Sequence, residues 1–249
     1  MRFQGKYYIV TGGASGIGRE ILLRLAREGA HILFGDRDIP ASEAVTRAAR
    51  EEGLKVDFHS LDLEDGASID AFVAASLKDQ AGLDGLVNCA GGFDVAEPFL
   101  QNTPAGWSRI LQINLLGMMH LTQGLLPVMI AKGAGRIVNI SSEAGRIGQP
   151  GIAAYSAAKA GVIVLTRLWA KEFARSGIAV NAIAPGPVDT PFLQRGMSQE
   201  GVDQIVQTIP LGRLGMPEDV ANMAVFFLDD ASGYITGQTI GVSGGLVMM

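Results

Sequence analysis

Short apolar runs alternate with segments of helical periodicity along the whole chain, and this alternation constrains the fold more than any other feature. The strand-like runs lie at residues 7–11, 31–34, 55–59, 83–87, 136–140, 178–183 and 239–242. Helical segments separate them at residues 19–28, 42–52, 69–80, 107–132, 152–173 and 218–228. The pattern predicts a parallel sheet whose faces are both covered by helices. We expect one doubly wound α/β domain over residues 1–249, with a seven-stranded sheet and a substrate loop at about residues 187–213.

The composition supports one large core and argues against several classes of function. Of 249 residues, 48% are hydrophobic, and a net charge of −5 gives no reason to expect nucleic-acid binding. The single cysteine, Cys89, and three scattered histidines provide no disulfide and no metal-binding pattern. The apolar stretch 110–130 is interrupted by polar side chains and indicates a buried helix rather than a membrane span. Because no signal peptide is recognisable, we expect a cytoplasmic protein.

Tyr155 and Lys159 are four residues apart in a helical segment, so both side chains project from one face. A positive charge about 4 Å from a phenol would lower the Tyr155 pKa from about 10 to roughly 7 or 8. The pair would then serve as a proton donor and acceptor near neutral pH. The alternative is an ordinary pair of surface side chains without a catalytic role, which would have the same spacing. The catalytic interpretation is favoured by Ser142, 13 residues before Tyr155, and by a glycine-rich turn far upstream.

That turn contains Gly12, Gly13, Gly16 and Gly18, where the first strand gives way to the first helix. Glycines allow a tight turn and close approach to a phosphate, and a helix N-terminus offers free N–H groups to an anion. The spacing differs from the GxGxxG fingerprint of general dinucleotide-binding folds. The alternative is a glycine-rich turn without a ligand.

Asp36 ends the second strand, 18 residues after Gly18. A carboxylate at this position accepts hydrogen bonds from the hydroxyls of an adenosine ribose and repels a 2′-phosphate. The residue therefore favours NAD over NADP. Arg37 is a complication because a neighbouring guanidinium can hold a phosphate, although we favour a solvated side chain.

The order and spacing of these motifs resemble the short-chain dehydrogenase/reductases over essentially the whole chain. The matching residues are Thr11-Gly12-x-x-x-Gly16-x-Gly18, Asn88-x-Ala90-Gly91, Asn114, Ser142, Tyr155-x-x-x-Lys159 and Pro185-Gly186. Cys89 departs from the family, which most often has a second Asn there. The resemblance implies a Rossmann-type fold.

The resemblance also implies the catalytic roles. Tyr155 is the general acid/base, and Lys159 lowers its pKa and binds the nicotinamide ribose. Ser142 orients and polarises the substrate oxygen, whereas its neighbour Ser141 is a structural hydroxyl. Asn114 holds the long helix open so that a water can link Lys159 to solvent.

The resemblance implies further residues along the cofactor. They are Gly12, Ser15, Gly16, Ile17, Gly18, Asp36, Arg37, Asp62, Leu63, Asn88, Ala90, Gly91, Tyr155, Lys159, Pro185, Gly186, Val188 and Thr190. Among them, residues 62–63 flank the adenine and residues 185–190 line the nicotinamide end. Candidates for the substrate pocket are Phe93, Asp94, Glu143, Arg146, Phe192, Leu193 and Met197. A solvated Arg146 is favoured over one that pairs with a substrate carboxylate or phosphate.

These features predict an NAD(H)-dependent oxidoreductase that interconverts a secondary alcohol and a ketone by hydride transfer. An NADP(H)-dependent 3-oxoacyl thioester reductase and a non-catalytic dinucleotide-binding sensor stay open as alternatives. An epimerase or dehydratase is disfavoured because such relatives usually carry a longer C-terminal substrate region. Segment 187–211 should contain a short amphipathic helix and act as a mobile lid. The helices at 107–132 and 152–173 are apolar nearly all round, which together with the family resemblance predicts a homotetramer.

Overall fold

The computed structural model describes residues 1–78, 82–92, 96–196 and 198–249. Within them, parallel strands form one seven-stranded sheet in the order β3-β2-β1-β4-β5-β6-β7. The strands are β1 (Tyr7–Thr11), β2 (His31–Asp36), β3 (Val56–Ser60), β4 (Gly85–Asn88), β5 (Gly135–Ile140), β6 (Ile178–Pro185) and β7 (Thr239–Val242). This arrangement confirms the predicted seven-stranded, doubly wound sheet.

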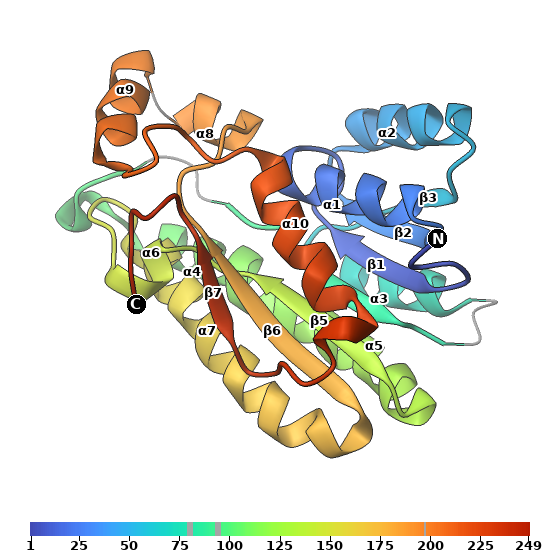
Figure 1. Ribbon diagram of the computed structural model, residues 1–249. Coiled ribbons are helices and arrows are strands. Elements are labelled where there is room, and N and C mark those ends of the chain that lie inside the picture. Colours follow the sequence, from blue (N-terminus) through green and yellow to red (C-terminus); the bar gives the residue numbers. More distant parts are fainter. Residues whose placement is uncertain (79–81, 93–95, 197) are drawn as a thin grey trace.

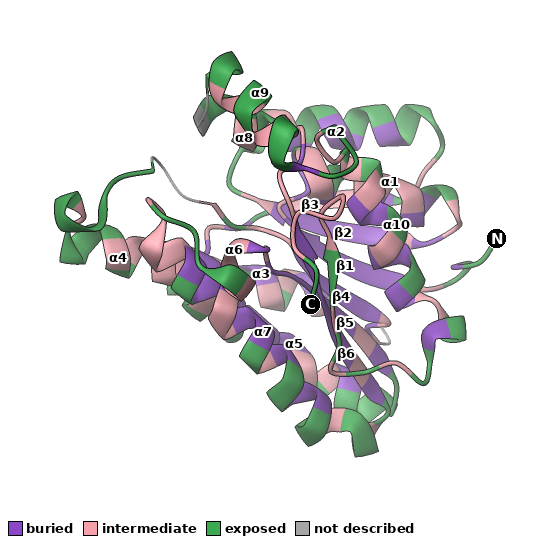
Figure 2. Cartoon of the chain, turned by 60° about the vertical axis from the view of Figure 1, so that its left-hand side comes forward, coloured by how far each residue is buried: buried purple, intermediate pink, exposed green. Residues whose placement is uncertain are grey.

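Helices cover both faces of the sheet (Figure 1). They are α1 (Gly16–Arg27), α2 (Ile39–Glu51), α3 (Gly66–Leu77), α4 (Pro104–Leu111), α5 (Gly117–Lys132), α6 (Ala144–Ile147), α7 (Ala153–Phe173), α8 (Pro191–Gly196), α9 (Gln199–Thr208) and α10 (Pro217–Leu228). Along β1, Tyr8 and Val10 pack into a core with α1, α2 and α10. Tyr7 and Ile9 point the other way, into a core with α3, α5 and α7. Figure 2 shows the resulting buried sheet between helices with exposed outer faces.

The long apolar helix differs from the single helix expected over residues 107–132. It begins at Pro104, and a π-helical turn, Gln112–Leu116, separates α4 from α5. The combined helix is long and apolar enough to cross a membrane by length and composition alone. However, Leu121, Leu125 and Met129 of α5 are fully buried in the protein interior. It is therefore a core helix of the fold.

The segment at 187–213 contains two helices, α8 and α9, rather than an irregular connection. The expectation of a short amphipathic helix there is confirmed: along α9, Val202, Ile205 and Val206 are partly covered, whereas polar residues are exposed. The segment follows β6 and therefore starts at the carboxyl ends of the strands, where ligands bind in doubly wound sheets.

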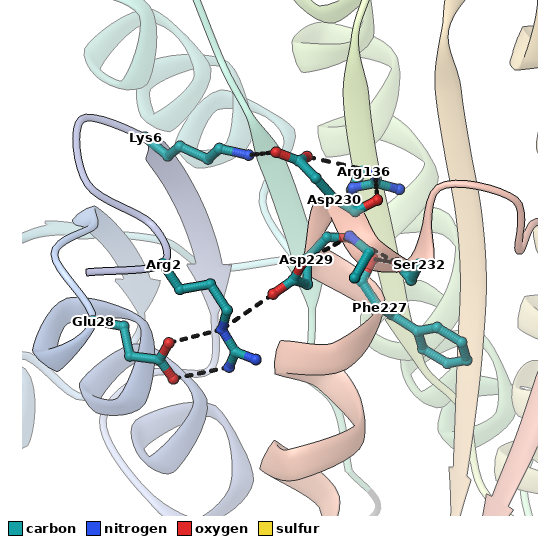
Figure 3. Close-up of polar contacts among 9 residues, drawn as sticks. Arg2, Lys6, Glu28, Arg136, Phe227, Asp229, Asp230 and Ser232 are labelled. Atoms are coloured by element: carbon teal, nitrogen blue, oxygen red, sulfur yellow. Dashed lines mark hydrogen bonds and ion pairs between the residues drawn. The ribbon is translucent and has the colours of Figure 1, made fainter.

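Ion pairs fasten the opposite end of the sheet, where the strands begin (Figure 3). Arg2 contacts Glu28 at 2.8 Å and Asp229 at 3.1 Å, and Lys6 contacts Asp230 at 2.6 Å. Exposed pairs of this kind each contribute at most about 1 kcal/mol. They tie the start of the chain to the segment after α10. These ion pairs therefore lie at the end of the sheet opposite the carboxyl ends of the strands, where ligands are expected.

Candidate active site

The turn between β1 and α1 has the backbone conformation that the glycines allow. Gly12 and Gly16 have φ angles of +73° and +54°, in the left-handed region that favours glycine. A Cβ on Gly18 would collide with the carbonyl oxygen of Gly12. Ser15, at the N-cap of α1, makes no side-chain capping bond, so its hydroxyl leaves the first N–H groups of the helix to another acceptor. These features fit the pyrophosphate of a dinucleotide.

Thr11 joins the turn to the end of β4, a function that the sequence did not reveal. Its hydroxyl oxygen accepts hydrogen bonds from the N–H groups of Cys89 and Ala90, both at 3.0 Å. A Cβ on Gly12 would lie only 3.0 Å from the Ala90 backbone. The available signal was the hydroxyl residue immediately before the glycines. The contact sets the spacing between two segments that are expected to flank a cofactor.

Asp36 is fixed at the carboxyl end of β2 by two backbone donors. Its Oδ2 accepts from the N–H of Ala14 at 3.0 Å, and its Oδ1 accepts from the N–H of Asp38 at 3.0 Å. The carboxylate is thereby held beside the glycine turn with lone pairs available for a ribose. The side chain of Arg37 is 62% exposed, as expected of a solvated arginine, and it also lies 3.4 Å from Glu64.

The residues expected near the adenine belong to an ordered turn. Asp62 Oδ1 accepts from the N–H of Glu64 at 2.9 Å, and Leu63 is buried. The side chain of Gln112 donates to the carbonyl oxygen of Leu63 at 3.0 Å. The turn after β3 is therefore attached to the π-helical turn that carries Asn114.

Asn88 is buried inside the sheet rather than on its surface. Its Nδ2 donates to Asn139 Oδ1 at 2.8 Å and to Thr122 Oγ1 at 3.1 Å, linking β4 to β5 and α5. Its Oδ1 has no hydrogen-bond partner among the described residues. Of the Asn88-x-Ala90-Gly91 motif, Cys89 and Ala90 are half-buried and Gly91 is exposed.

Asn114 locks the π-helical turn onto the loop after β4. Its Nδ2 donates to the carbonyl oxygens of Gly92 at 2.7 Å and Ile110 at 2.9 Å, and its Oδ1 accepts from the N–H of Gly92 at 2.9 Å. A Cβ on Gly91 would lie 2.5 Å from Asn114 Oδ1 and 3.2 Å from Lys159 Nζ. A glycine at position 91 therefore lets the Asn114 amide and the Lys159 ammonium approach each other.

Ser142, Tyr155 and Lys159 come together from β5 and α7. The hydroxyls of Ser142 and Tyr155 share a hydrogen bond. Lys159 is buried, and its Nζ donates to the carbonyl oxygen of Ile140 at 2.9 Å. Ser141 is also buried and donates to the carbonyl oxygen of Lys159 at 2.8 Å. This contact confirms Ser141 as a structural hydroxyl.

The expected low pKa of Tyr155 is wrong. Burial raises the pKa of the Tyr155 phenol to about 12, because the phenolate would lose more hydration than the hydrogen bond from Ser142 offsets. Burial also lowers the pKa of the Lys159 ammonium to about 8. The Lys159 Nζ lies 5.6 Å from the centre of the Tyr155 ring. At neutral pH Tyr155 therefore keeps its proton, whereas Lys159 remains mostly charged.

The segment after β6 folds back over the glycine turn. The N–H of Gly186 donates to the carbonyl oxygen of Val242 at 3.0 Å, and Val188 bridges to Gly215. Thr190 is buried, with its methyl group 3.1 Å from where a Cβ on Gly16 would lie. The two ends of the predicted cofactor site thus meet at Thr190.

Two of the substrate-pocket candidates form a buried ion pair instead. Arg146 contacts Glu143 at 3.2 Å, and their side chains are 13% and 4% exposed. Arg146 also donates to the carbonyl oxygen of Thr239 at 3.4 Å. The favoured solvated Arg146 is therefore wrong, because the guanidinium connects α6 to β7. Its alternative role, pairing with a substrate anion, stays a prediction. Phe192 and Leu193 are half-buried, and residues 93, 94 and 197 lie outside the described residues.

Comparisons with known proteins agree with this arrangement. A family model described as "Enoyl-(Acyl carrier protein) reductase" matches residues 12–247. A 3-oxoacyl-[acyl-carrier-protein] reductase of Thermotoga maritima is 40% identical over 100% of both chains. A human (3R)-3-hydroxyacyl-CoA dehydrogenase is 37% identical, covering 99% of this chain and 97% of its own.

The names of two further similar proteins mention a cofactor. A 2-dehydro-3-deoxy-L-rhamnonate dehydrogenase (NAD(+)) of a Sphingomonas species is 37% identical over 98% of this chain and 96% of its own. The crystal structure of an actinorhodin polyketide ketoreductase with NADPH superposes with a TM-score of 0.91, at 33% identity over 97% of both chains. The matches extend over nearly the whole chain and all describe oxidoreductases. These relatives act on hydroxyl and carbonyl groups with a nicotinamide dinucleotide. The chain therefore belongs to the short-chain dehydrogenase/reductase family.

Proposed function

We propose that this protein interconverts 3-hydroxyacyl and 3-oxoacyl thioesters with NAD(H). The observation that carries the proposed chemistry is the convergence of Ser142, Tyr155 and Lys159 at the end of β5. The sequence left thioesters open as an alternative class of substrate. They now take precedence because 3-oxoacyl-[acyl-carrier-protein] and (3R)-3-hydroxyacyl-CoA occur in the names of similar proteins.

Tyr155 and Ser142 would hold the oxygen atom of the substrate. A bound nicotinamide supplies or accepts the hydride. In reduction, the protonated phenol gives its proton to the carbonyl oxygen; in oxidation, the phenolate takes that proton back. The high Tyr155 pKa keeps this proton in place at neutral pH, the form that carbonyl reduction uses. Lys159, with a pKa of about 8, can return a proton to the phenolate.

Asp36 is the basis for choosing NAD(H). Its carboxylate is fixed by the N–H groups of Ala14 and Asp38, and its charge would repel a 2′-phosphate. Similar proteins are named with either NADPH or NAD(+), so the residues of this chain must decide. We expect NADH to displace NADPH in competition binding, and Asp36→Ala to relax that preference. Stronger binding of NADPH to the parent would overturn the assignment.

Exposed apolar side chains beside the site support an acyl substrate. Phe99 and Leu100 follow β4, Ile147 ends α6, and all three are exposed. The two segments are tied together by the N–H of Glu97, which donates to the carbonyl oxygen of Gly151 at 2.8 Å. An acyl chain would cover such side chains, whereas a polyol would leave them in water.

Initial rates with a panel of compounds test the proposal. The panel contains 3-oxoacyl-CoA, the matching acyl-carrier-protein thioester, an enoyl thioester, a polyol and a cyclic ketone, each with NADH and NADPH. We expect the highest kcat/KM with a 3-oxoacyl thioester and NADH. A preference for the polyol or cyclic ketone would replace the substrate class. Tight NADH binding without turnover of any compound would support the non-catalytic sensor.

The single domain, the lid and the cytoplasmic location remain part of this proposal. Residues 1–249 would form one domain, in which segment 187–211 closes over the cofactor. Hydrogen exchange tests the lid. Amides 190–207 should become more protected when NAD and substrate bind, whereas equal protection in both states would make the segment a fixed wall.

A further inference from the structure

Glu64 lies between two arginines at the edge of the predicted ribose site. Its Oε2 is 3.4 Å from Nη1 of Arg37, the residue that follows Asp36. Its Oε1 is 2.9 Å from Nε of Arg109 on α4. One carboxylate thus joins the end of β2 to the helix that leads into the Asn114 turn.

Backbone hydrogen bonds hold the turn that carries Glu64. The N–H of Glu64 donates to Asp62 Oδ1 at 2.9 Å, and the N–H of Asp62 donates to Ser68 Oγ at 2.9 Å. The Glu64 side chain is 29% exposed, whereas that of Arg37 is 62% exposed. The partly buried carboxylate is therefore the fixed member of the pair, and the arginine is the adaptable one.

We propose that Glu64 is a specificity-determining residue that withholds Arg37 from the 2′-phosphate of NADP(H). A guanidinium beside the ribose is well suited to a phosphate because its N–H groups form a planar fork. Glu64 engages this group and offsets its positive charge, so the guanidinium is less available to a phosphate. The inference rests on the proposed NAD(H) preference and adds a second carboxylate to it.

The variant Glu64→Gln tests the inference by dissociation constants for NADH and NADPH. The exposed pair contributes little to stability, so the fold should persist. We expect the ratio of NADPH to NADH affinity to rise about two- to fivefold, the scale of one weak ion pair. Glu52→Gln is the matched control. Glu52 also pairs with an arginine, Arg27 at 3.0 Å, and its replacement removes the same charge far from Asp36.

The double variant Arg37→Gln/Glu64→Gln shows whether the effect passes through Arg37. We expect the double variant to lose the gain of Glu64→Gln. An unchanged ratio in Glu64→Gln, an equal rise in Glu52→Gln, or a gain that survives Arg37→Gln would each overturn the inference. The parent ratio separately tests the proposed function: a parent that prefers NADPH contradicts the NAD(H) assignment, whereas an NADH-preferring parent with an unresponsive Glu64 variant contradicts only this inference.

Discussion

The ammonium of Lys159 lies 5.6 Å from the centre of the Tyr155 ring while it donates a hydrogen bond to the carbonyl oxygen of Ile140 at 2.9 Å. Both side chains come from one face of α7, but burial sets the direction of each pKa. It raises that of the phenol and lowers that of the ammonium. The pair is therefore arranged to keep one proton on Tyr155 and a second, more labile one on Lys159.

The buried Lys159 should make stability depend on pH. Its pKa falls from 10.5 to about 8 on folding, so the unfolded chain binds this proton more strongly between these values. The contribution of Lys159 to the free energy of unfolding should then rise by about 3 kcal/mol from pH 8 to pH 10.5. Urea titrations of the parent and Lys159→Met at one protein concentration measure it. A difference between the two proteins that stays constant with pH would contradict the buried charge.

Arg146 should matter for stability because its partner is buried. Replacing it by Met leaves the Glu143 carboxyl without its cation, and we expect a loss of about 3 kcal/mol or more. Arg50→Met is the control, since Arg50 pairs with Asp57 at 2.8 Å between side chains that are at least half exposed. That substitution should cost less than about 1 kcal/mol. Equal losses in urea unfolding would mean that the Glu143 pair is not held in the interior.

Much of the fold could be predicted from the sequence because its signals are local. The bounds of β1 and β7 agree with the predicted strands, and the alternation of elements correctly indicated a parallel sheet. The helical composition of the segment did not reveal the break at Gln112–Leu116, because it depends on the Asn114 side chain bonding to Gly92 across the fold. Only the family resemblance, through Asn114, implied that the helix is held open there.

The charged contacts of the site could not be predicted for a similar reason. Arg146 and Glu143 are three residues apart, but their burial depends on β7, almost a hundred residues later. Glu64 forms ion pairs with arginines from two other segments of the chain. The spacing of Tyr155 and Lys159 placed both on one face, whereas their pKa values depend on burial that spacing does not encode.

The exposed apolar faces of α5 and α7 lead us to expect a homotetramer. Leu116 just before α5, Met119 on α5, and Val164 and Leu168 on α7 are exposed in the single chain, as are Met248 and Met249 at its end. Two such surfaces suit an assembly with perpendicular two-fold axes. Light scattering should give four times the mass of one chain, and Leu168→Glu should reduce it. Leu100→Glu, which adds the same charge on a separate exposed segment, should leave the mass unchanged. A parent that stays monomeric at micromolar concentration would contradict the prediction.

The turnover of Tyr155→Phe tests the account most directly, because this substitution removes one hydroxyl and little volume. The measurement compares kcat with a 3-oxoacyl thioester, together with the dissociation constant of NADH, in the parent and the variant. We predict a loss in kcat of at least about a hundredfold, the scale of a general acid, while NADH affinity stays within about threefold. A variant whose kcat remains within about threefold of the parent would contradict the assignment of Tyr155 as the proton donor.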